Sequence, residues 1–135
     1  MDKIKIIGGN PLFGKVFISG AKNTALPIIC ASLLTDEPVT LHNLPILSDI
    51  TSLNLLLQQI GTQIEGKQED LNGHITQTFT YYTPKPTSLV APYDYVRKMR
   101  ASYYVLGPLL TKYRHVELSL PGGCAIGARP MDIHL

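Results

Sequence analysis

A glycine-rich loop near the end of the sequence carries the side chains best suited to chemistry. In the stretch SLPGGCAIGARPMD, residues 119–132, Cys124 stands among three glycines and is followed by Arg129. Glycines let consecutive backbone amides approach an anion closely, and a planar guanidinium suits phosphate or carboxylate. Amide dipoles and a nearby cation also favour the thiolate form of Cys124. These residue types suit an anion site with a reactive sulfur, although the residues alone favour the simpler interpretation that follows. The alternative is an ordinary tight turn around a small packed cysteine.

A second cationic position lies at the start of a predicted helix. Lys22 and Asn23 follow Gly20 and precede the almost wholly apolar stretch 25–34. Unpaired amides and the helix dipole favour an anion at such a start, so a lysine there is unfavourable for the helix itself. This placement assigns Lys22 to a bound anion, against the alternative of a solvated lysine on a loop.

The remaining charged or reactive side chains have simpler interpretations. Arg97, Lys98 and Arg100 form a basic cluster in which Arg97 and Arg100 share a helix face, and a solvated face is the alternative. Cys30 lies in the middle of the apolar stretch, which predicts a core residue. The four histidines form no HxxxH or HxH pair, so the sequence predicts no metal site.

Predicted strands and helices alternate along the chain and must position these residues. Apolar patterns predict strands at 4–7, 15–18, 39–41, 62–65, 74–78 and 116–120. Helical spacing predicts a helix that begins near residues 22–24 and runs to 34, and two more at 48–60 and 96–110. Residues 81–92 are expected to form a loop or an edge strand. The alternation indicates an α/β or α+β fold.

Punctuating residues set the expected ends of these elements. The expected signals are Ser48-Asp49 as an N-cap, Gly61 as a helix end, Asn72-Gly73 as a turn, and Gly107-Pro108 kinking or dividing the third helix. Pro27 is acceptable only in the first turn of its helix, because proline lacks an amide hydrogen.

The bulk composition narrows the class of protein. The 135 residues, with 44% hydrophobic and 16% charged side chains, suit one domain or part of a larger one and argue against disorder. A net charge of +2 gives no strong attraction to nucleic acid or to a membrane. Two cysteines cannot form a disulfide scaffold, which favours a reducing cytoplasm, and we expect neither a signal peptide nor a membrane helix. The ending RPMDIHL carries no turn signal, so we expect a sequence that is cut rather than finished.

Longer motifs point to one known family. SGAKNTALP, APYDYVRKMRAS, LGPLL and LPGGCAIGARPMDIH occur in this order, and the match is tightest at 18–34, 91–110 and 118–134 and weakest at 66–90. The chain resembles the N-terminal part of the UDP-N-acetylglucosamine 1-carboxyvinyltransferases, which are enolpyruvyl transferases. The resemblance implies transfer of the enolpyruvyl group of phosphoenolpyruvate to the 3′-hydroxyl of UDP-N-acetylglucosamine, with release of phosphate, as the first committed step of peptidoglycan synthesis. It implies small-molecule substrates, no metal and no organic cofactor.

The resemblance also implies roles for particular residues. Lys22 and Asn23 match the pair that contacts phosphoenolpyruvate, and Asn23 and Arg100 match residues that contact the nucleotide sugar. Cys124 matches the cysteine that protonates the enolpyruvyl methylene, forms a covalent adduct with phosphoenolpyruvate and is the target of fosfomycin. The family's segment around the nucleotide sugar is matched here by Arg129, Pro130, Met131, Asp132 and Ile133. Arg129 is also expected to contact phosphoenolpyruvate.

The fold that the resemblance implies is an inside-out α/β barrel of repeated βαβαββ units, present here only in part. Residues 1–21 would belong with a second domain, and residues 22–135 would form an incomplete first domain carrying the cysteine loop. Because the active site lies between two domains, we expect the 135-residue chain by itself to be inactive. Two alternatives stay open. One is a truncated remnant that binds a nucleotide sugar or a partner without catalysis. The other is an enzyme like 5-enolpyruvylshikimate-3-phosphate synthase, against which PGGCAIGARP argues.

Overall fold

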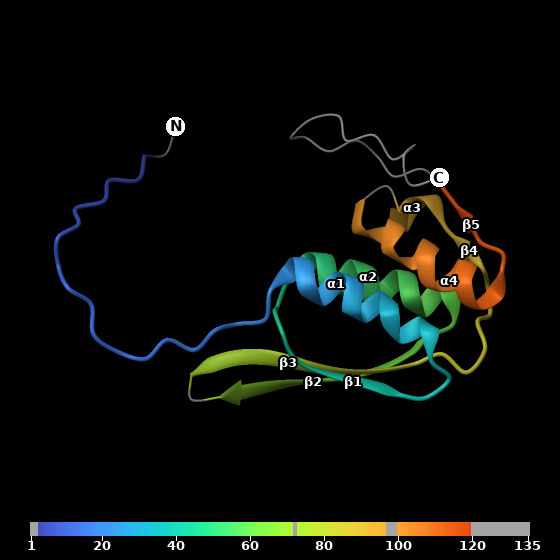
Figure 1. The fold of residues 1–135 in the computed structure, drawn as a ribbon, viewed down its shortest axis with the longest axis horizontal. Helices are drawn as coiled ribbons and strands as arrows, with labels where there is room; N and C mark the ends of the chain where they lie inside the picture. The colour runs from blue at the N-terminus through green and yellow to red at the C-terminus, as the bar shows by residue number, and fades with distance from the viewer. Residues whose placement is uncertain (1–2, 72, 97–99, 120–135) are drawn as a thin grey trace.

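The computed structural model describes residues 3–71, 73–96 and 100–119, and the side chains of residues 71, 100 and 101 lie outside the description. The described chain consists of an extended arm over residues 3–20 followed by a packed body (Figure 1). The helices and strands of the body are α1 (Lys22–Ala31), η1 (Ser32–Leu34), β1 (Val39–Leu44), α2 (Ser48–Ile60), β2 (Gln63–Leu71), β3 (His74–Tyr82), β4 (Val90–Ala91), α3 (Tyr93–Val96), η2 (Arg100–Val105), α4 (Leu106–Tyr113) and β5 (Glu117–Leu118), where η denotes a 3₁₀ helix.

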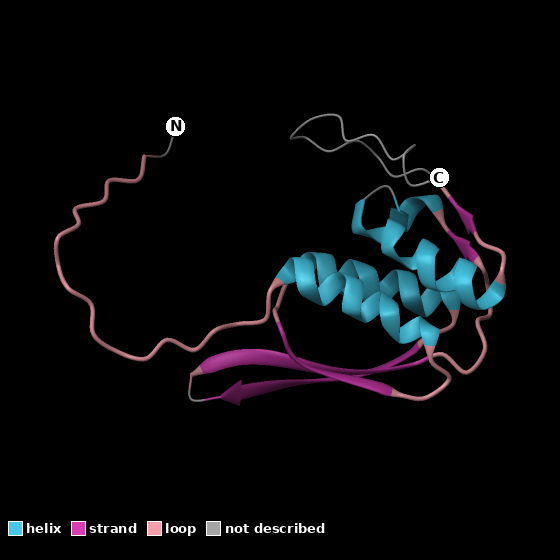
Figure 2. Ribbon diagram, viewed as in Figure 1, coloured by secondary structure: helices cyan, strands magenta, loops and turns pink. Residues whose placement is uncertain are grey.

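An antiparallel sheet of order β1-β3-β2 forms one layer, and the helices cover one of its faces (Figure 2). The hairpin between β2 and β3 pairs Leu71 with His74, which leaves a two-residue connection. Gly73 adopts φ 82° there, a left-handed conformation that glycine takes without strain. The pairing of Leu71 with His74 on either side confirms the predicted turn at 72–73. A second, two-stranded parallel sheet joins β4 and β5 across the intervening helices.

The core lies between the helices and the inner face of the sheet. In α2 the spacing that predicted the helix places Ile50, Leu53, Leu57 and Ile60 in the interior, each at most 1% exposed. Gly61 ends this helix with φ 109°, as expected for a left-handed terminating residue. The buried apolar side chains form one cluster: Ala25, Leu26, Ile29, Cys30, Leu33, Leu44, Ile50, Leu53, Leu56, Leu57, Ile60, Tyr81, Ala91, Val96, Val105 and Leu109.

A lysine ties α4 to the end of the first helical segment. The Lys112 ammonium donates to the carbonyl oxygens of Leu33 at 3.2 Å and Thr35 at 2.9 Å, and it pairs with the Asp36 carboxylate at 2.7 Å. The last carbonyls of a helix lack partners inside the helix, and a cation there also meets the negative end of the helix dipole. Lys112 therefore closes the α1–η1 segment from a distant part of the chain.

The strands predicted at 4–7 and 15–18 do not form. Residues 3–20 contain neither helix nor strand, and within the described chain no strand pairs with them. A strand needs a neighbour for its backbone hydrogen bonds, and an apolar pattern alone does not supply one. The observed order α1-β1-α2-β2-β3 is the expected βαβαββ unit without its first strand.

Several predicted ends of elements also need correction. The first helix begins at Lys22 as expected, but Pro27 then falls in its second turn, so the Asn23 carbonyl receives no helical bond from residue 27. The N-cap of α2 is Leu47 rather than Ser48. The predicted division of the third helix at Gly107-Pro108 is confirmed, but it falls before Leu106. Pro108 therefore lies in the first turn of α4, where a missing amide hydrogen costs little.

Strand lengths and the later segments differ in smaller ways. The strands β1, β2 and β3 extend beyond their predicted ends, because pairing with neighbours continues past the local apolar pattern. Within residues 81–92, where a loop or an edge strand was expected, Tyr81 and Tyr82 complete β3, and Val90–Ala91 forms the short strand β4. The last predicted strand is confirmed as Glu117–Leu118, and residue 120 lies outside the description.

Candidate functional site

The first turn of α1 is an uncapped helix start. Ala21 is its N-cap residue with extended backbone angles of φ −86° and ψ 131°, and it forms no side-chain capping bond. The amides of Thr24 and Ala25 donate to the Ala21 carbonyl at 3.2 and 2.9 Å. The turn also lacks an acidic residue. The positive end of the α1 dipole therefore faces solvent, and no acidic side chain of α1 offsets it.

Lys22 brings a further positive charge to this helix start. Its ammonium lies 2.9 Å from Oδ2 of Asp49, which belongs to the first turn of α2. The two side chains are 49% and 34% exposed, so the pair is accessible from solvent. The pair can form because α1 and α2 lie side by side and begin at the same end of the helical layer (Figure 1). The site thus combines two helix starts, one cation and one carboxylate.

The backbone entering α1 is fixed against β1. A Cβ atom on Gly20 would collide with the carbonyl oxygen of Asn43, so no larger residue fits here without movement. Asn43 has φ 55°, an uncommon left-handed conformation, at the irregularity in the pairing of β1. Its side chain donates to the Ile18 carbonyl at 3.4 Å and accepts from the Thr76 hydroxyl at 3.2 Å. Asn43 therefore anchors the chain just before Lys22.

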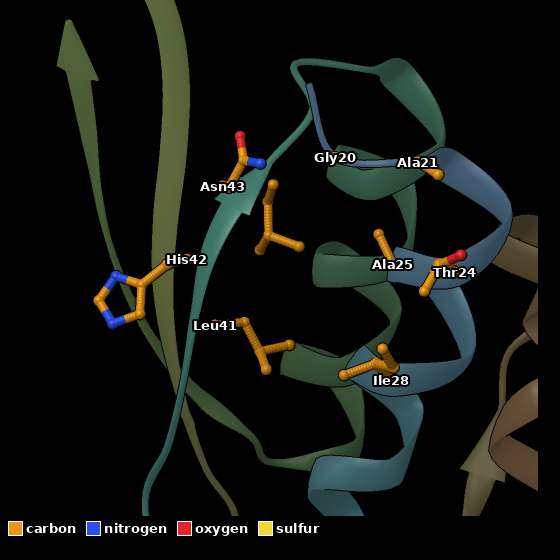
Figure 3. Close-up of a pocket in the computed structure, with 9 residues that line it drawn as sticks. Gly20, Ala21, Thr24, Ala25, Ile28, Leu41, His42 and Asn43 are labelled. Atoms are coloured by element: carbon orange, nitrogen blue, oxygen red, sulfur yellow. The ribbon is translucent and has the colours of Figure 1, made fainter. Parts of the chain in front are cut away.

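A hollow of about 200 Å³ lies between α1 and β1, next to this anchor. Figure 3 shows Leu41 and Ala25 pointing into the space between strand and helix, whereas His42 points away from it. The lining is mostly apolar and contains none of the residues predicted to bind substrate, although Ala21 directly precedes Lys22. The hollow thus belongs to the packing between α1 and β1, and the charged groups lie outside its lining.

The other predicted site residues are placed only in part. Asn23 lies in α1 beside Lys22 and is exposed. Arg100 begins η2, which packs against α1, and its side chain lies outside the description. The remaining predicted site residues all lie outside the described residues: Cys124, Arg129, Pro130, Met131, Asp132 and Ile133. The structure therefore places Lys22 and Asn23 at the start of α1, and the substrate roles of all the predicted site residues stay predictions.

Cys30 is a core residue, as predicted. Its side chain is 1% exposed within α1, and burial raises the pKa of its thiol to about 12. Removing the thiol proton in an apolar interior would leave an unsolvated charge, so this sulfur stays protonated at neutral pH. Within these 135 residues, a reactive thiol has to be sought at Cys124.

Sequence reasoning missed Asp49 as a member of this site. It was interpreted only as part of a helix cap, whereas its carboxylate pairs with Lys22, 27 positions earlier in the chain. An acidic residue in the first turn of one helix and a lysine in the first turn of another were visible in the sequence. The missing information was that the two helices pack against each other and start at the same end of the helical layer (Figure 1).

Two classes of feature are absent from the part of the chain that the structure describes. No three histidine, cysteine, aspartate or glutamate side chains gather where they could hold a metal ion. None of the described helices has the length and apolar character needed to cross a bilayer.

Comparison with known proteins identifies close relatives. The chain is 50% identical over 135 residues to the UDP-N-acetylglucosamine 1-carboxyvinyltransferase of Endomicrobium trichonymphae, covering all of this chain and 30% of that protein. It is 53% identical to the enzyme of the same name from Sphingopyxis alaskensis and 47% identical to that from Brucella ovis, covering 31% and 32% of them. The chain therefore spans about a third of the length of these curated relatives.

A solved structure and a family model agree with these relatives. The enolpyruvyl transferase NikO from Streptomyces tendae superposes with a TM-score of 0.57 at 25% identity, covering 77% of this chain and 22% of that one. This likeness confirms the predicted fold class. The packed body described above corresponds to part of such a fold. A sequence model of the family described as EPSP synthase (3-phosphoshikimate 1-carboxyvinyltransferase) matches residues 6–135. With nearly all of its residues matched, the chain belongs to the EPSP synthase (3-phosphoshikimate 1-carboxyvinyltransferase) family.

Proposed function

We propose that the full-length protein carrying these residues transfers the enolpyruvyl group of phosphoenolpyruvate to the 3′-hydroxyl of UDP-N-acetylglucosamine and releases phosphate. The observation that carries the proposal is identity of about 50% over the whole chain to relatives named for this reaction. The motif PGGCAIGARP supports the same acceptor in preference to a shikimate phosphate. The reaction would supply peptidoglycan synthesis. A cytoplasmic location is part of the proposal and is supported by the free thiol of Cys30.

In this proposal the start of α1 binds phosphoenolpyruvate. The positive end of α1 and the ammonium of Lys22 both favour an anion, and Asn23 adds a neutral hydrogen-bonding side chain beside them. Cationic and amide donors of this kind stabilise a phosphate group as it becomes the leaving group. Lys22 and Asn23 would therefore hold the phosphate of the donor substrate.

The cysteine loop would supply the acid for the reaction. The Cys124 thiol would donate a proton to C3 of the enolpyruvyl group, and the sugar hydroxyl oxygen would then bond to C2 as it loses its own proton. Loss of a C3 proton and of phosphate from this adduct restores the double bond. Arg129 would bind phosphate, and Arg100 with the segment 129–133 would bind the nucleotide sugar. A glycine-rich loop suits this role because it can close over the substrates and exclude water.

A phosphate-release assay on the full-length protein tests the proposed reaction. Phosphoenolpyruvate with UDP-N-acetylglucosamine should give phosphate and a product heavier than the acceptor by one enolpyruvyl group. Phosphoenolpyruvate with shikimate 3-phosphate should give neither. Turnover with the shikimate acceptor instead would assign the protein to the other branch of its family, and turnover with neither acceptor would refute the proposal.

Fosfomycin labelling tests the role of the loop cysteine separately. Peptide mapping of the full-length protein should find one adduct, on Cys124, which forms faster with UDP-N-acetylglucosamine present. Cys124→Asp should lose the adduct while keeping a proton donor, and Cys30→Ala should label as the unchanged protein does because Cys30 is buried. An adduct on Cys30, or no adduct at all, would exclude a reactive loop thiol.

The domain division is also part of the proposal. Residues 1–21 would pack with the rest of the full-length protein, and residues 22–135 would form part of one domain of a two-domain enzyme. The exposed apolar side chains of the arm support this division, because large apolar surfaces on soluble proteins usually meet a partner surface. The 135-residue chain alone should release no phosphate, and normal turnover by it would contradict the division of the site between domains.

A further inference from the structure

Asp49 stands where it can control the Lys22 side chain. Its Oδ2 atom lies 2.9 Å from the Lys22 ammonium, although the two residues belong to different helices. Both occupy the first turns of helices that start at the same end of the layer. A carboxylate is favourable at a helix start, whereas an ammonium is not. The carboxylate of α2 thus offsets the unfavourable position of the cation of α1.

The ion pair between Lys22 and Asp49 should add little to the stability of the fold. The two side chains are 49% and 34% exposed, and ion pairs between such side chains contribute little to folding because water screens them and long side chains lose freedom. Ala25, Leu26 and Ile50, which are close to the pair in sequence, already belong to the buried apolar core. The pair is better explained by what it does to the lysine than by what it adds to the fold.

The Lys22 side chain can still rotate about its own bonds, and pairing with Asp49 can restrict this rotation. The backbone ahead of it is fixed, since Gly20 packs on the Asn43 carbonyl and Asn43 holds Ile18 through its side chain. The flexible stem of Lys22 would otherwise let its ammonium sweep a wide volume of solvent. An ammonium has three donors, so a bond to Asp49 leaves others for an anion at the start of α1.

We propose that Asp49 is a positioning residue for Lys22, holding its ammonium at the start of α1 so that it meets the phosphate of phosphoenolpyruvate. This inference rests on the proposed function of the same site. It differs from a purely electrostatic role, in which the negative charge of Asp49 would repel the substrate anion. It also differs from a structural role, in which the loss of Asp49 would act through folding and not through Lys22.

The test is a double-mutant cycle in the full-length protein, with kcat and both KM values measured by phosphate release. Asp49→Asn should raise the KM for phosphoenolpyruvate about tenfold and leave the KM for UDP-N-acetylglucosamine within about twofold, as expected when a binding group is misplaced. Asp49→Glu keeps the charge and should recover most of the loss. In a Lys22→Gln background, Asp49→Asn should have no further effect.

A matched control breaks another exposed ion pair. Glu69→Gln removes the partner of Lys67 on β2, and Thr78, which also bonds Glu69, contacts His42 on the sheet face away from the helices. This variant should leave both KM values unchanged. Melting temperatures of all variants, measured by circular dichroism, separate a folding defect from a kinetic one, and Asp49→Glu serves where Asp49→Asn does not fold.

Each outcome decides the inference. An equal loss from Asp49→Asn with and without Lys22 would overturn it, and so would a lower KM for phosphoenolpyruvate in Asp49→Asn, which would mark Asp49 as a competitor for the lysine. Calorimetric titration with phosphoenolpyruvate distinguishes this failure from failure of the proposed reaction. If neither acceptor is turned over, a loss of phosphoenolpyruvate affinity in Asp49→Asn that requires Lys22 still supports the inference, and unchanged affinity refutes it.

Discussion

The extended arm and the packed body of this chain have similar apolar patterns, but the apolar side chains of the arm are exposed and those of the body are buried. In the arm, Leu12 is 94% exposed and Phe13 is 95% exposed. In the body, Leu33 and Leu53 are both completely buried. The two regions meet at Gly20, which packs against Asn43 of β1 immediately before α1 begins. Both regions are therefore hydrophobic. They differ in that only the body has a surface against which its apolar side chains can pack.

The difference teaches what a strand or helix requires in addition to its pattern. A helix satisfies its own backbone hydrogen bonds, so α1 and α2 need only a common apolar interface. A strand satisfies its backbone through neighbours, as β3 does between β1 and β2. The arm has apolar residues at strand spacing but no neighbouring strand among the described residues. Replacing the same residue type in both regions tests this comparison directly.

The largest contrast should come from leucine-to-alanine replacements. Leu53→Ala in the 135-residue chain should lower the free energy of unfolding by about 2–5 kcal/mol, because it removes buried methyl groups and leaves a cavity. Leu12→Ala should change it by less than about 0.5 kcal/mol, because the side chain is already in water. Urea unfolding followed by circular dichroism measures both. Similar losses in the two variants would show that the arm packs in solution.

A glycine pair tests the junction between the two regions. Gly20→Ala should destabilise the fold by about 1–3 kcal/mol, because the new methyl group would overlap the Asn43 carbonyl and force the backbone apart. Gly8→Ala in the arm should have almost no effect, since nothing lies within 4 Å of the added atom. The measurement is the midpoint of thermal unfolding. An unchanged midpoint in Gly20→Ala would mean that the contact with Asn43 is not maintained.

The smallest contrast should come from lysines. Lys112→Met should cost about 1.5 kcal/mol, because the Leu33 and Thr35 carbonyls and the Asp36 carboxylate lose a charged partner, whereas Lys5→Met in the arm should cost nothing measurable. Burial alone would lower the pKa of Lys112, but hydrogen bonding to Asp36 raises it overall. This contribution should be complete below the ordinary lysine pKa and disappear as the pH rises through the raised value. Equal urea midpoints for the two variants at pH 7 would show that the bonds of Lys112 to Leu33, Thr35 and Asp36 do not stabilise the fold.

Much of the body was predictable because its signals are local. The apolar spacing of Ile50, Leu53 and Ile60 predicted α2, and the glycine that follows was expected to end it. The Asn72-Gly73 pair predicted the hairpin, since two-residue hairpin turns favour residues that accept left-handed backbone angles, as Gly73 does. The burial of Cys30 followed from its place in an apolar helix. Gly107-Pro108 predicted a kink or division in the third helix, and the structure divides it one residue earlier, before Leu106, where the helical spacing itself gives no signal.

The candidate site was predictable in its residue types and not in its arrangement. Lys22 was recognised because a cation at a helix start is locally unfavourable, and the structure places it there. Asp49 was overlooked because its interpretation as a cap looked complete within its own helix. The substrate-binding and catalytic roles of every predicted site residue remain predictions, and Cys124, Arg129 and the residues after them also lie outside the described residues.

The sequence by itself determined the alternation of helices and strands, the hairpin turn, the buried cysteine and the motifs by which the family is recognised. Those properties depend on neighbouring residues, whose spacing fixes which face of an element is apolar and where its backbone can turn. The tertiary structure alone decided that the arm forms no strand, that Gly20 lies against Asn43 and that Lys22 pairs with Asp49. Each of these depends on groups far apart in the chain. Backbone pairing, steric contact and ion pairing act over a few ångströms in space and leave no periodic signal in the sequence.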